Sequence, residues 1–249
     1  MNSQEMLDKL SNHRSIRFFD DRKVNEETLL QLLSVAQTAS TSSNLQAYSI
    51  VKVDDAQKRQ EIAKIAGNQA HVVQAPVFLV FCGDLYRLKA AGELEDKEFN
   101  TDYLESFLVS AVDTAIVAQN FLAAAELTGL GGVYIGGIRN DMKRMIELLE
   151  LPPYSYPLFG MCIGYPDANK MPDKKPRFPL QFILHQDQYD TEKTREAITE
   201  YNQIMKDYYN SRDSSRRDIT WSSHLLKEYS KPRRTTVKES LKQQKLGLE

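Results

Sequence analysis

Hydrophobic and polar positions follow two different periods along the first two thirds of the chain. Residues 24–40 (VNEETLLQLLSVAQTAS) carry apolar side chains three and four positions apart, which is the spacing of one buried helix face. Asn25 stands before that run and is a preferred N-cap residue. A second helix is expected over residues 55–67, ending at Gly67. The first run predicts a buried stripe formed by Leu29, Leu32, Leu33 and Ala36.

Shorter apolar runs predict four strands. They cover residues 47–53, 75–83, 131–137 and 158–166. The run at 75–83 (APVFLVFCG) is apolar throughout, which is typical of a strand covered on both faces. Cys82 and Cys162 lie within these runs, so we expect two reduced, buried thiols.

One apolar run is much longer than the others. Residues 103–129 (YLESFLVSAVDTAIVAQNFLAAAELTG) are alanine-rich and apolar almost all round. A helix of this kind is buried on most faces, so a central helix or a subunit interface explains it best. Asn140 is expected to cap the helix that follows, with Met142, Met145, Ile146 and Leu149 on one face.

The character of the chain changes after Pro166. A loop rich in proline and lysine leads to an amphipathic helix over about residues 191–209. The last forty residues hold one tryptophan, many charges and little apolar periodicity. We expect this tail to be too polar for a core of its own and to pack on something else.

Composition limits the classes of function. The chain has 249 residues, of which 41% are hydrophobic and 27% charged, as in ordinary globular proteins. A net charge of -2 argues against a general polyanion binder, yet residues 205–249 carry 11 Lys and Arg against 6 Asp and Glu. That excess favours an anionic ligand or an acidic partner surface. The polar N-terminus is no signal peptide, and no apolar run is expected to span a membrane, so a cytoplasmic location is expected.

Familiar catalytic motifs are absent from the sequence. The stretch GLGGVYIGG follows a helix and has Tyr134 where a dinucleotide fingerprint needs its last glycine. The four histidines have no metal-ligand spacing, and no hydrolase elbow is present. If the protein is an enzyme, a cofactor therefore carries the chemistry, with no catalytic side chain and no metal expected.

The stretch HRSIR at residues 13–17 is the first of several candidate sites. In an extended segment, residues 13, 15 and 17 share a face, which here offers an imidazole, a hydroxyl and a guanidinium. These groups suit a phosphate. The alternative is a solvated charge cluster paired with Asp20 and Asp21, which the residues alone slightly favour.

Four further stretches carry similar alternatives. The hydroxyl-rich residues 39–49 are either a polar ligand loop or a plain helix end. The glycines of 131–137 serve either close approach to a flat ligand or tight packing. The cations at 175–177 and 212–217 are either anion contacts or solvated charges, and interleaved aspartates weaken a nucleic-acid interpretation.

Taken together, these stretches resemble the nitroreductase superfamily, in particular its NADPH-dependent flavin reductases and oxygen-insensitive major nitroreductases. The resemblance rests on HRSIRFF, STSSNLQAYS, AGNQAHV, GLGGVYIGGIRN, PLFGMCIGYP, KKPRFP and RRDITW, in that order over nearly the whole chain. It implies an α+β fold with a small, mostly antiparallel sheet packed by helices. It further implies an intertwined homodimer with FMN at the subunit interface. Residues 1–249 would form one domain, with 190–249 extending onto the partner subunit.

The resemblance also assigns roles to residues. Arg212, Arg216 and Arg217 match a basic loop that favours NADPH over NADH. Asn44 stands where related sequences often carry an aromatic residue, which would affect acceptor preference. The residues implied to bind FMN are His13, Arg14, Ser15, Arg17, Thr41, Ser42, Ser43, Gln69, Tyr134, Ile135, Gly136, Gly137, Lys175 and Arg177.

The implied activity is a ping-pong reaction on FMN. NADPH passes a hydride to flavin N5, and flavin, nitroaromatic, quinone-type or disulfide acceptors then take the electrons. Two alternatives stay open. One is a flavin- or RNA-binding protein with a basic tail and no turnover, and the other is a sister enzyme with a different acceptor.

Overall fold

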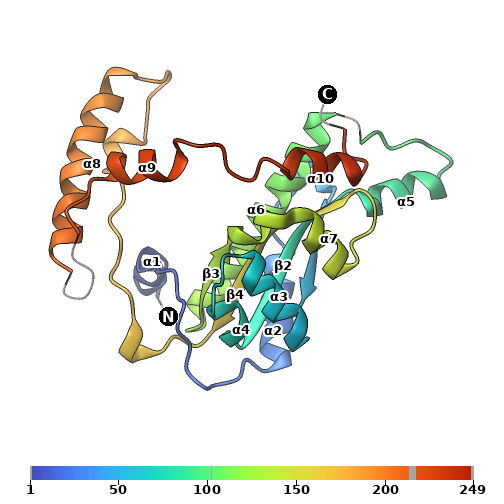
Figure 1. Ribbon diagram of the computed structural model, residues 1–249, viewed down its shortest axis with the longest axis horizontal. Helices are drawn as coiled ribbons and strands as arrows, with labels where there is room; N and C mark the ends of the chain where they lie inside the picture. Colours follow the sequence, from blue (N-terminus) through green and yellow to red (C-terminus); the bar gives the residue numbers. More distant parts are fainter. Residues whose placement is uncertain (1, 102, 213–216, 248–249) are drawn as a thin grey trace. The chain divides into compact units, whose positions relative to one another are not determined.

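The computed structural model describes residues 2–101, 103–212 and 217–247 (Figure 1). The described residues form two compact units. The first comprises the chain up to Pro172 together with the residues from Arg234 onward, and the second runs from Asp173 to Arg233. The chain therefore leaves the first unit once and returns to it.

A four-stranded antiparallel sheet forms the centre of the first unit, in the order β1-β2-β4-β3. Its inner strand β2 is buried at every position, as its unbroken apolar run predicts. Each of the four predicted apolar runs contains one strand or most of one. The helices together with the antiparallel sheet confirm the α+β class. The strands are β1 (Tyr48–Lys52), β2 (Val77–Asp84), β3 (Gly131–Ile135) and β4 (Ser155–Gly164).

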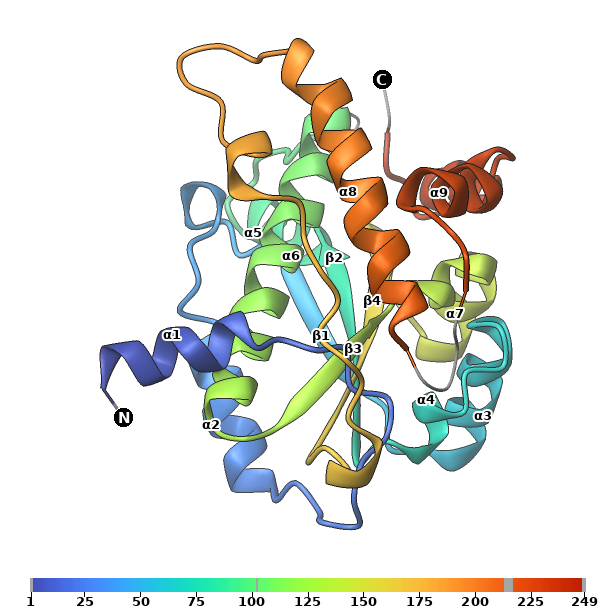
Figure 2. The same ribbon diagram turned by 90° about the vertical axis from the view of Figure 1, so that its left-hand side faces the viewer.

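Helices α2 (Glu26–Ala36) and α6 (Leu104–Leu127) cover one face of the sheet (Figure 2). The predicted cap of α2 is present, since the Asn25 side chain accepts a hydrogen bond from the Thr28 backbone N–H at 2.7 Å. Leu29 and Leu32 point into the core that α6 and the sheet share. The apolar period of this segment thus predicted both the helix and its buried face.

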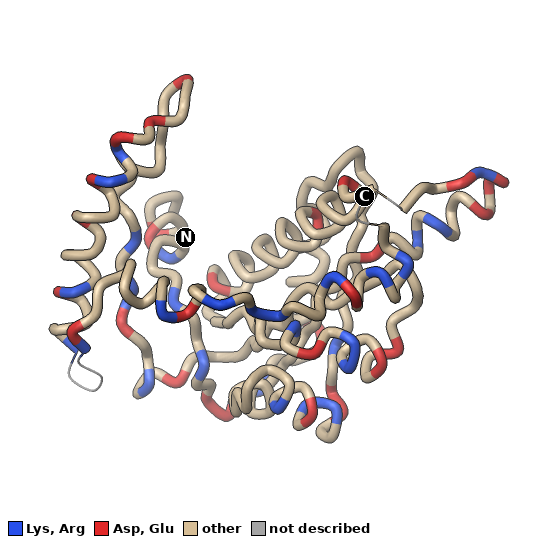
Figure 3. The backbone as a smooth tube through the Cα atoms, turned by 45° about the horizontal axis from the view of Figure 1, so that its top comes forward, with Lys and Arg blue, Asp and Glu red and all other residues tan. Residues whose placement is uncertain are grey.

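Helix α6 is buried along one side only. Val117, Phe121 and Leu122 are fully buried. The opposite side exposes an apolar stripe, formed by Leu104, Leu108, Val112 and Ile116 at four-residue intervals. Figure 3 shows how few charges this helix carries. Contrary to expectation, α6 is long and apolar enough for a membrane span, a criterion that core helices of soluble proteins also meet.

The other face of the sheet is covered by α3 (Ala56–Ile65), α4 (His71–Gln74) and α7 (Met142–Leu149). A 3-10 turn, η2 (Gly136–Asp141), connects β3 to α7. The expectation that Asn140 caps α7 is wrong. The turn extends one residue further, so that Asp141 accepts from the Arg144 backbone N–H at 3.0 Å.

Among the described residues, the first unit contains three further helices. They are α1 (Ser3–Ser11), α5 (Tyr86–Leu94) and α10 (Val237–Gln243). Around α10, Leu241 and Leu246 are buried against Tyr156 and Met142. The chain end thus completes the core of the first unit.

The second unit contains η4 (Leu180–Phe182), α8 (Glu192–Asn210) and α9 (Trp221–Tyr229). Its aromatic side chains form a core, with the Phe178 and Tyr201 rings stacked at 3.9 Å and the Trp221 ring 5.1 Å from Phe178. The last forty residues form no separate core among the described residues. Ile219 and Trp221 pack against Tyr201, Met205 and Tyr209 of α8, as the expectation that the tail packs on something else requires. The assignment of residues 1–249 to one domain stays a prediction. The contact of residues 190–249 with a partner subunit also stays a prediction.

Candidate functional site

Residues 13–17 lie beside the start of β3. The Ile16 backbone N–H donates to the Gly132 carbonyl at 3.0 Å. The Ile16 side chain is buried over Gly131, where an added Cβ would approach it to 2.6 Å. This close contact fixes the segment on the sheet and leaves its flanking polar residues near the surface.

The polar side chains of this segment take different directions. The Arg17 guanidinium donates to the Ser15 carbonyl at 3.3 Å. Burial and the positive charge of Arg17 together lower the pKa of His71. The His13 imidazole turns toward the end of α6 instead, where its Nδ1 lies 2.5 Å from Glu126 Oε1. Ser15, Arg17 and His71 therefore form one polar neighbourhood, and His13 faces another.

Gln69 lies on the α3–α4 connection, and His71 is the first residue of α4. The Gln69 side-chain amide donates to the Ala66 carbonyl at 2.8 Å. His71 Nε2 is buried and has no hydrogen-bond partner among the described residues. A buried ring nitrogen without a partner leaves hydrogen-bonding capacity for a ligand.

The hydroxyl-rich loop is held by a buried carboxylate that the sequence did not single out. Asp113 of α6 is 1% exposed and accepts from the backbone N–H groups of Ser42 at 2.9 Å and Ala47 at 3.1 Å. Within this loop, Ser43, Asn44 and Gln46 have positive φ angles, a conformation that side chains disfavour. The hydrogen bonds of Asp113 therefore position Thr41, Ser42 and Ser43.

The glycines of 131–137 serve two purposes. A Cβ on Gly132 would lie 2.5 Å from Ile163 Cδ1, and one on Gly137 would lie 2.7 Å from the Ala66 carbonyl oxygen. Tight packing thus explains both. Gly136 differs, because its nearest neighbour would be Arg139 Nη2 at an ordinary 3.5 Å. Space beside the backbone exists at Gly136, as a flat ligand requires.

Tyr134 of β3 and Gly136, the first residue of η2, line a cavity of about 450 Å³. The side chain of Ile135 points the other way, into the core. The Tyr134 hydroxyl donates to Gln119 of α6 at 3.2 Å, and burial raises the pKa of this hydroxyl. The remaining lining residues are Ala115, Gln119, Arg139 and Phe159.

Two arginines beside Gly136 were missed by the sequence reasoning. Arg139 Nη2 and Arg234 Nη1 lie 3.5 and 3.8 Å from the position that a Gly136 Cβ would take. Burial and the charge of Arg234 lower the pKa of Arg139. Arg234 also donates to Asn140 Oδ1 at 3.1 Å. Arg139 could have been noticed from its place after the glycine pair, whereas Arg234 had no local signal.

The remaining predicted cations belong to the second unit. The Arg177 guanidinium donates to the Lys175 carbonyl at 2.8 Å. Arg212 pairs with Asp173 at 3.7 Å, and the Arg217 backbone N–H donates to the Tyr209 carbonyl at 3.3 Å. Arg216 lies outside the described residues.

The groups of the first unit fit a flavin mononucleotide. Guanidinium, hydroxyl and imidazole groups suit its phosphate and ribityl chain, and the space beside Gly136 suits its ring. No cluster of metal-ligating side chains occurs within the described ranges. Cys82 and Cys162 are fully buried thiols, as expected.

Two family models and several known relatives match this chain. The model described as "Nitroreductase family" matches residues 10–165, and "Nitroreductase family, C-terminal domain" matches residues 175–249. "FMN reductase (NADPH)" of Bacillus subtilis is 41% identical over 95% of this chain and 96% of its own length. "Oxygen-insensitive NADPH nitroreductase" of Salmonella typhimurium is 39% identical over 96% of both chains.

Solved structures agree over the whole length. NfrA2 of B. megaterium is 38% identical with a TM-score of 0.94 and full coverage of both chains. The NADPH:FMN oxidoreductase of Vibrio harveyi, solved with NAD⁺, is 40% identical with a TM-score of 0.86 and 98% coverage of both chains. On the combined evidence of sequence, fold and site, the chain belongs to the nitroreductase family.

Proposed function

We propose that the protein is an NADPH-dependent, FMN-containing oxidoreductase that reduces flavin, nitroaromatic or quinone-type acceptors. The proposal rests mainly on Gly136, where there is space beside the backbone. Arg139 and Arg234 flank this space. Gly136 also lines the cavity that Tyr134 lines. The relatives named as NADPH-dependent FMN reductase and nitroreductase support it. When bound, FMN would supply hydride transfer from NADPH to the acceptor.

The phosphate end of the cofactor is assigned to the polar neighbourhood of Ser15, Arg17 and His71. Arg17 offers a planar pair of donors for phosphate oxygens. The buried Nε2 of His71 has no partner among the described residues and can serve a further ligand oxygen when it carries the proton.

The ring end is assigned to residues 134–137. Gly136 lets the ring approach the backbone, and two guanidinium groups stand beside it. Positive charge at this position stabilises negative charge that develops on a bound ring during reduction. Arg139 and Arg234 therefore orient the ring and favour its reduced form.

We further infer that the active form is a homodimer. The two FMN segments are anchored at different points of α6, residues 13–17 through Glu126 and residues 41–43 through Asp113. Thirteen helical residues separate those anchors, or roughly 20 Å along the axis. A second copy that packs against the exposed apolar stripe of α6 would supply the hydroxyl loop to the partner's flavin.

NADPH is assigned to the basic residues of the second unit. Arg212 and Arg217, with Arg216, offer positive charge for a 2′-phosphate, which NADH lacks. Lys175 and Arg177 are assigned to FMN. These roles and a cytoplasmic location are proposed from the resemblance.

The proposal is tested by purifying the protein and following NADPH consumption. We expect co-purified FMN in about one copy per chain and acceptor-dependent NADPH oxidation with parallel-line, ping-pong kinetics. A panel of free flavin, a nitroaromatic compound and a quinone identifies the preferred acceptor. Bound flavin without acceptor-dependent turnover would favour the alternative of a flavin-binding protein without catalysis.

A further inference from the structure

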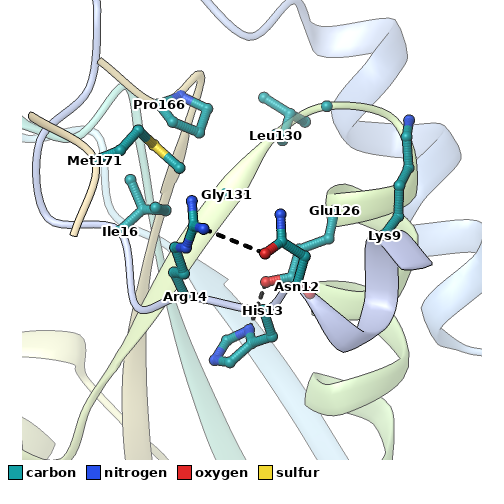
Figure 4. A pocket seen from close by; sticks show the side chains of 11 residues that line it. Lys9, Asn12, His13, Arg14, Ile16, Glu126, Leu130, Gly131, Pro166 and Met171 are labelled. Atoms are coloured by element: carbon teal, nitrogen blue, oxygen red, sulfur yellow. Dashed lines mark hydrogen bonds and ion pairs between the residues drawn. The ribbon is translucent and has the colours of Figure 1, made fainter. Parts of the chain in front are cut away.

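A second cavity lies at the opposite end of β3 from Gly136. It has a volume of about 190 Å³ and is enclosed by the end of α1, the end of α6 and the turn before β3 (Figure 4). None of the described residues that line it also lines the Tyr134 cavity. Gly131 in its wall precedes Gly136 by five residues, which is roughly 16 Å along a strand.

Arg14 gives this cavity an unsatisfied cationic group. Its Nη2 donates to Asn12 Oδ1 at 3.3 Å, and Figure 4 shows the two side chains meeting. Its Nε is buried without a hydrogen-bond partner among the described residues. Buried donors of charged groups are normally satisfied, so an acceptor is missing at this position.

A second cation and one acid complete the polar lining. The Lys9 ammonium donates to the Leu127 carbonyl at 3.0 Å, which uses one of its three N–H groups. Glu126 also borders the cavity, but its Oε1 is held by His13 at 2.5 Å. The site therefore attracts one negative charge, and the nearby carboxylate disfavours a dianion.

The rest of the wall is apolar. Ile16 and Met171 line the side away from Lys9, and Leu130 lies between (Figure 4). The volume holds several water molecules and so accommodates a small organic acid. The lining combines a guanidinium for a carboxylate with a surface for a short aliphatic chain.

We propose that this cavity binds a small aliphatic monocarboxylate, whose oxygens accept from Arg14 while its chain contacts Leu130 and Met171. Ser15 and Arg17 do not line the cavity, since they alternate with Arg14 and Ile16 along the extended segment. His13 and Arg14, which the resemblance implied for FMN, do line it, so the proposal assigns the Arg14 side chain to this ligand in place of FMN. The inference does not rest on the proposed activity.

The test uses butyrate and FMN-saturated protein in isothermal titration calorimetry. We expect a dissociation constant on the order of a millimolar, as suits so small a ligand. Acetate is expected to bind more weakly because it lacks the chain. Inorganic phosphate is expected to bind more weakly because of Glu126, and n-butanol because it lacks the carboxylate.

Variants separate the site from general anion binding. Arg14→Gln is expected to weaken the binding of butyrate at least tenfold. Lys9→Gln, on an exposed helix, is expected to weaken it severalfold. Arg22→Gln, which removes an exposed arginine paired with Asp20, serves as the matched control and is expected to have no effect. The proposal is overturned if wild-type protein does not bind butyrate or if Arg14→Gln and Lys9→Gln bind it unchanged. It is equally overturned if FMN displaces butyrate, because the cavity would then belong to the cofactor.

Discussion

Neighbouring glycines with opposite surroundings provide a test at the residue scale. A Cβ at Gly137 would meet the Ala66 backbone, whereas a Cβ at Gly136 would meet only the flexible ends of Arg139 and Arg234. Gly137→Ala is expected to reduce the free energy of unfolding by about 1–3 kcal/mol. Gly136→Ala is expected to change the free energy of unfolding by less than about 0.5 kcal/mol. The same variant is expected to weaken FMN binding about tenfold, as measured by flavin fluorescence.

Each variant serves as the control for the other. Normal FMN affinity in Gly136→Ala would contradict the placement of the flavin ring beside that backbone. A fully stable Gly137→Ala would contradict the packing explanation for the second glycine.

The basic residues of the second unit supply another prediction at this scale. Replacing Arg212, Arg216 and Arg217 with glutamine is expected to raise the KM for NADPH about tenfold or more and that for NADH less than about twofold. The reason is that only NADPH carries the 2′-phosphate. Steady-state kinetics with both donors measures the ratio, and neutralising Lys193 and Lys227 in the same unit controls for charge. An equal rise of KM for both donors would contradict the role of these arginines in binding the 2′-phosphate.

At the scale of elements, Asp113 connects helix α6 to the hydroxyl loop. In Asp113→Asn, an amide N–H₂ would face one of the backbone N–H groups that the carboxylate now accepts. The lost hydrogen bond and the buried donor are expected to destabilise the loop by about 1–3 kcal/mol. FMN should then bind more weakly, with kcat for the flavin-loaded fraction less affected.

The matched control is Ser110→Ala on the same buried face of α6. Its hydroxyl bonds with Tyr156 at 2.9 Å and does not contact the loop. It should reduce stability without changing the dissociation constant of FMN. If both variants lower the free energy of unfolding equally and leave FMN binding unchanged, Asp113 has only a structural role.

Elements with a clear apolar period were predictable from the sequence. Helix α2 with its Asn25 cap and the four strands follow from local patterns. The aromatic core of the second unit was not recognised, because Tyr201, Met205 and Tyr209 repeat every four residues within a polar stretch. Tyrosine contributes a large apolar ring despite its hydroxyl, and a count of polar residues overlooks it.

The candidate site was predictable only where its residues are contiguous. The segments 13–17 and 134–137 are visible as short stretches. Asp113 lies within an apolar helix, and the loop it holds is 66 to 71 residues away in sequence. Arg234 reaches Asn140 across 94 residues. Partners at such separations are chosen by the tertiary fold, so no local pattern identifies them.

At the scale of the whole molecule, the apolar stripe of α6 predicts self-association. Val112 is 53% exposed at the centre of that stripe. Val112→Glu is expected to raise the dimer dissociation constant at least tenfold (about 1.4 kcal/mol), because it would place a charge in an apolar interface. Sedimentation velocity measures the change. Leu94→Glu, at an 87% exposed position on α5, is the control, and equal behaviour of the two variants would contradict an interface on α6.

We expect this chain to hold FMN and NADPH to reduce it. The most direct measurement is the visible absorbance of the purified, flavin-loaded protein during anaerobic titration with NADPH. We predict that one equivalent of NADPH per flavin bleaches the absorbance and that an added quinone or nitroaromatic acceptor restores it without oxygen. Flavin that stays oxidised under excess NADPH would contradict the account.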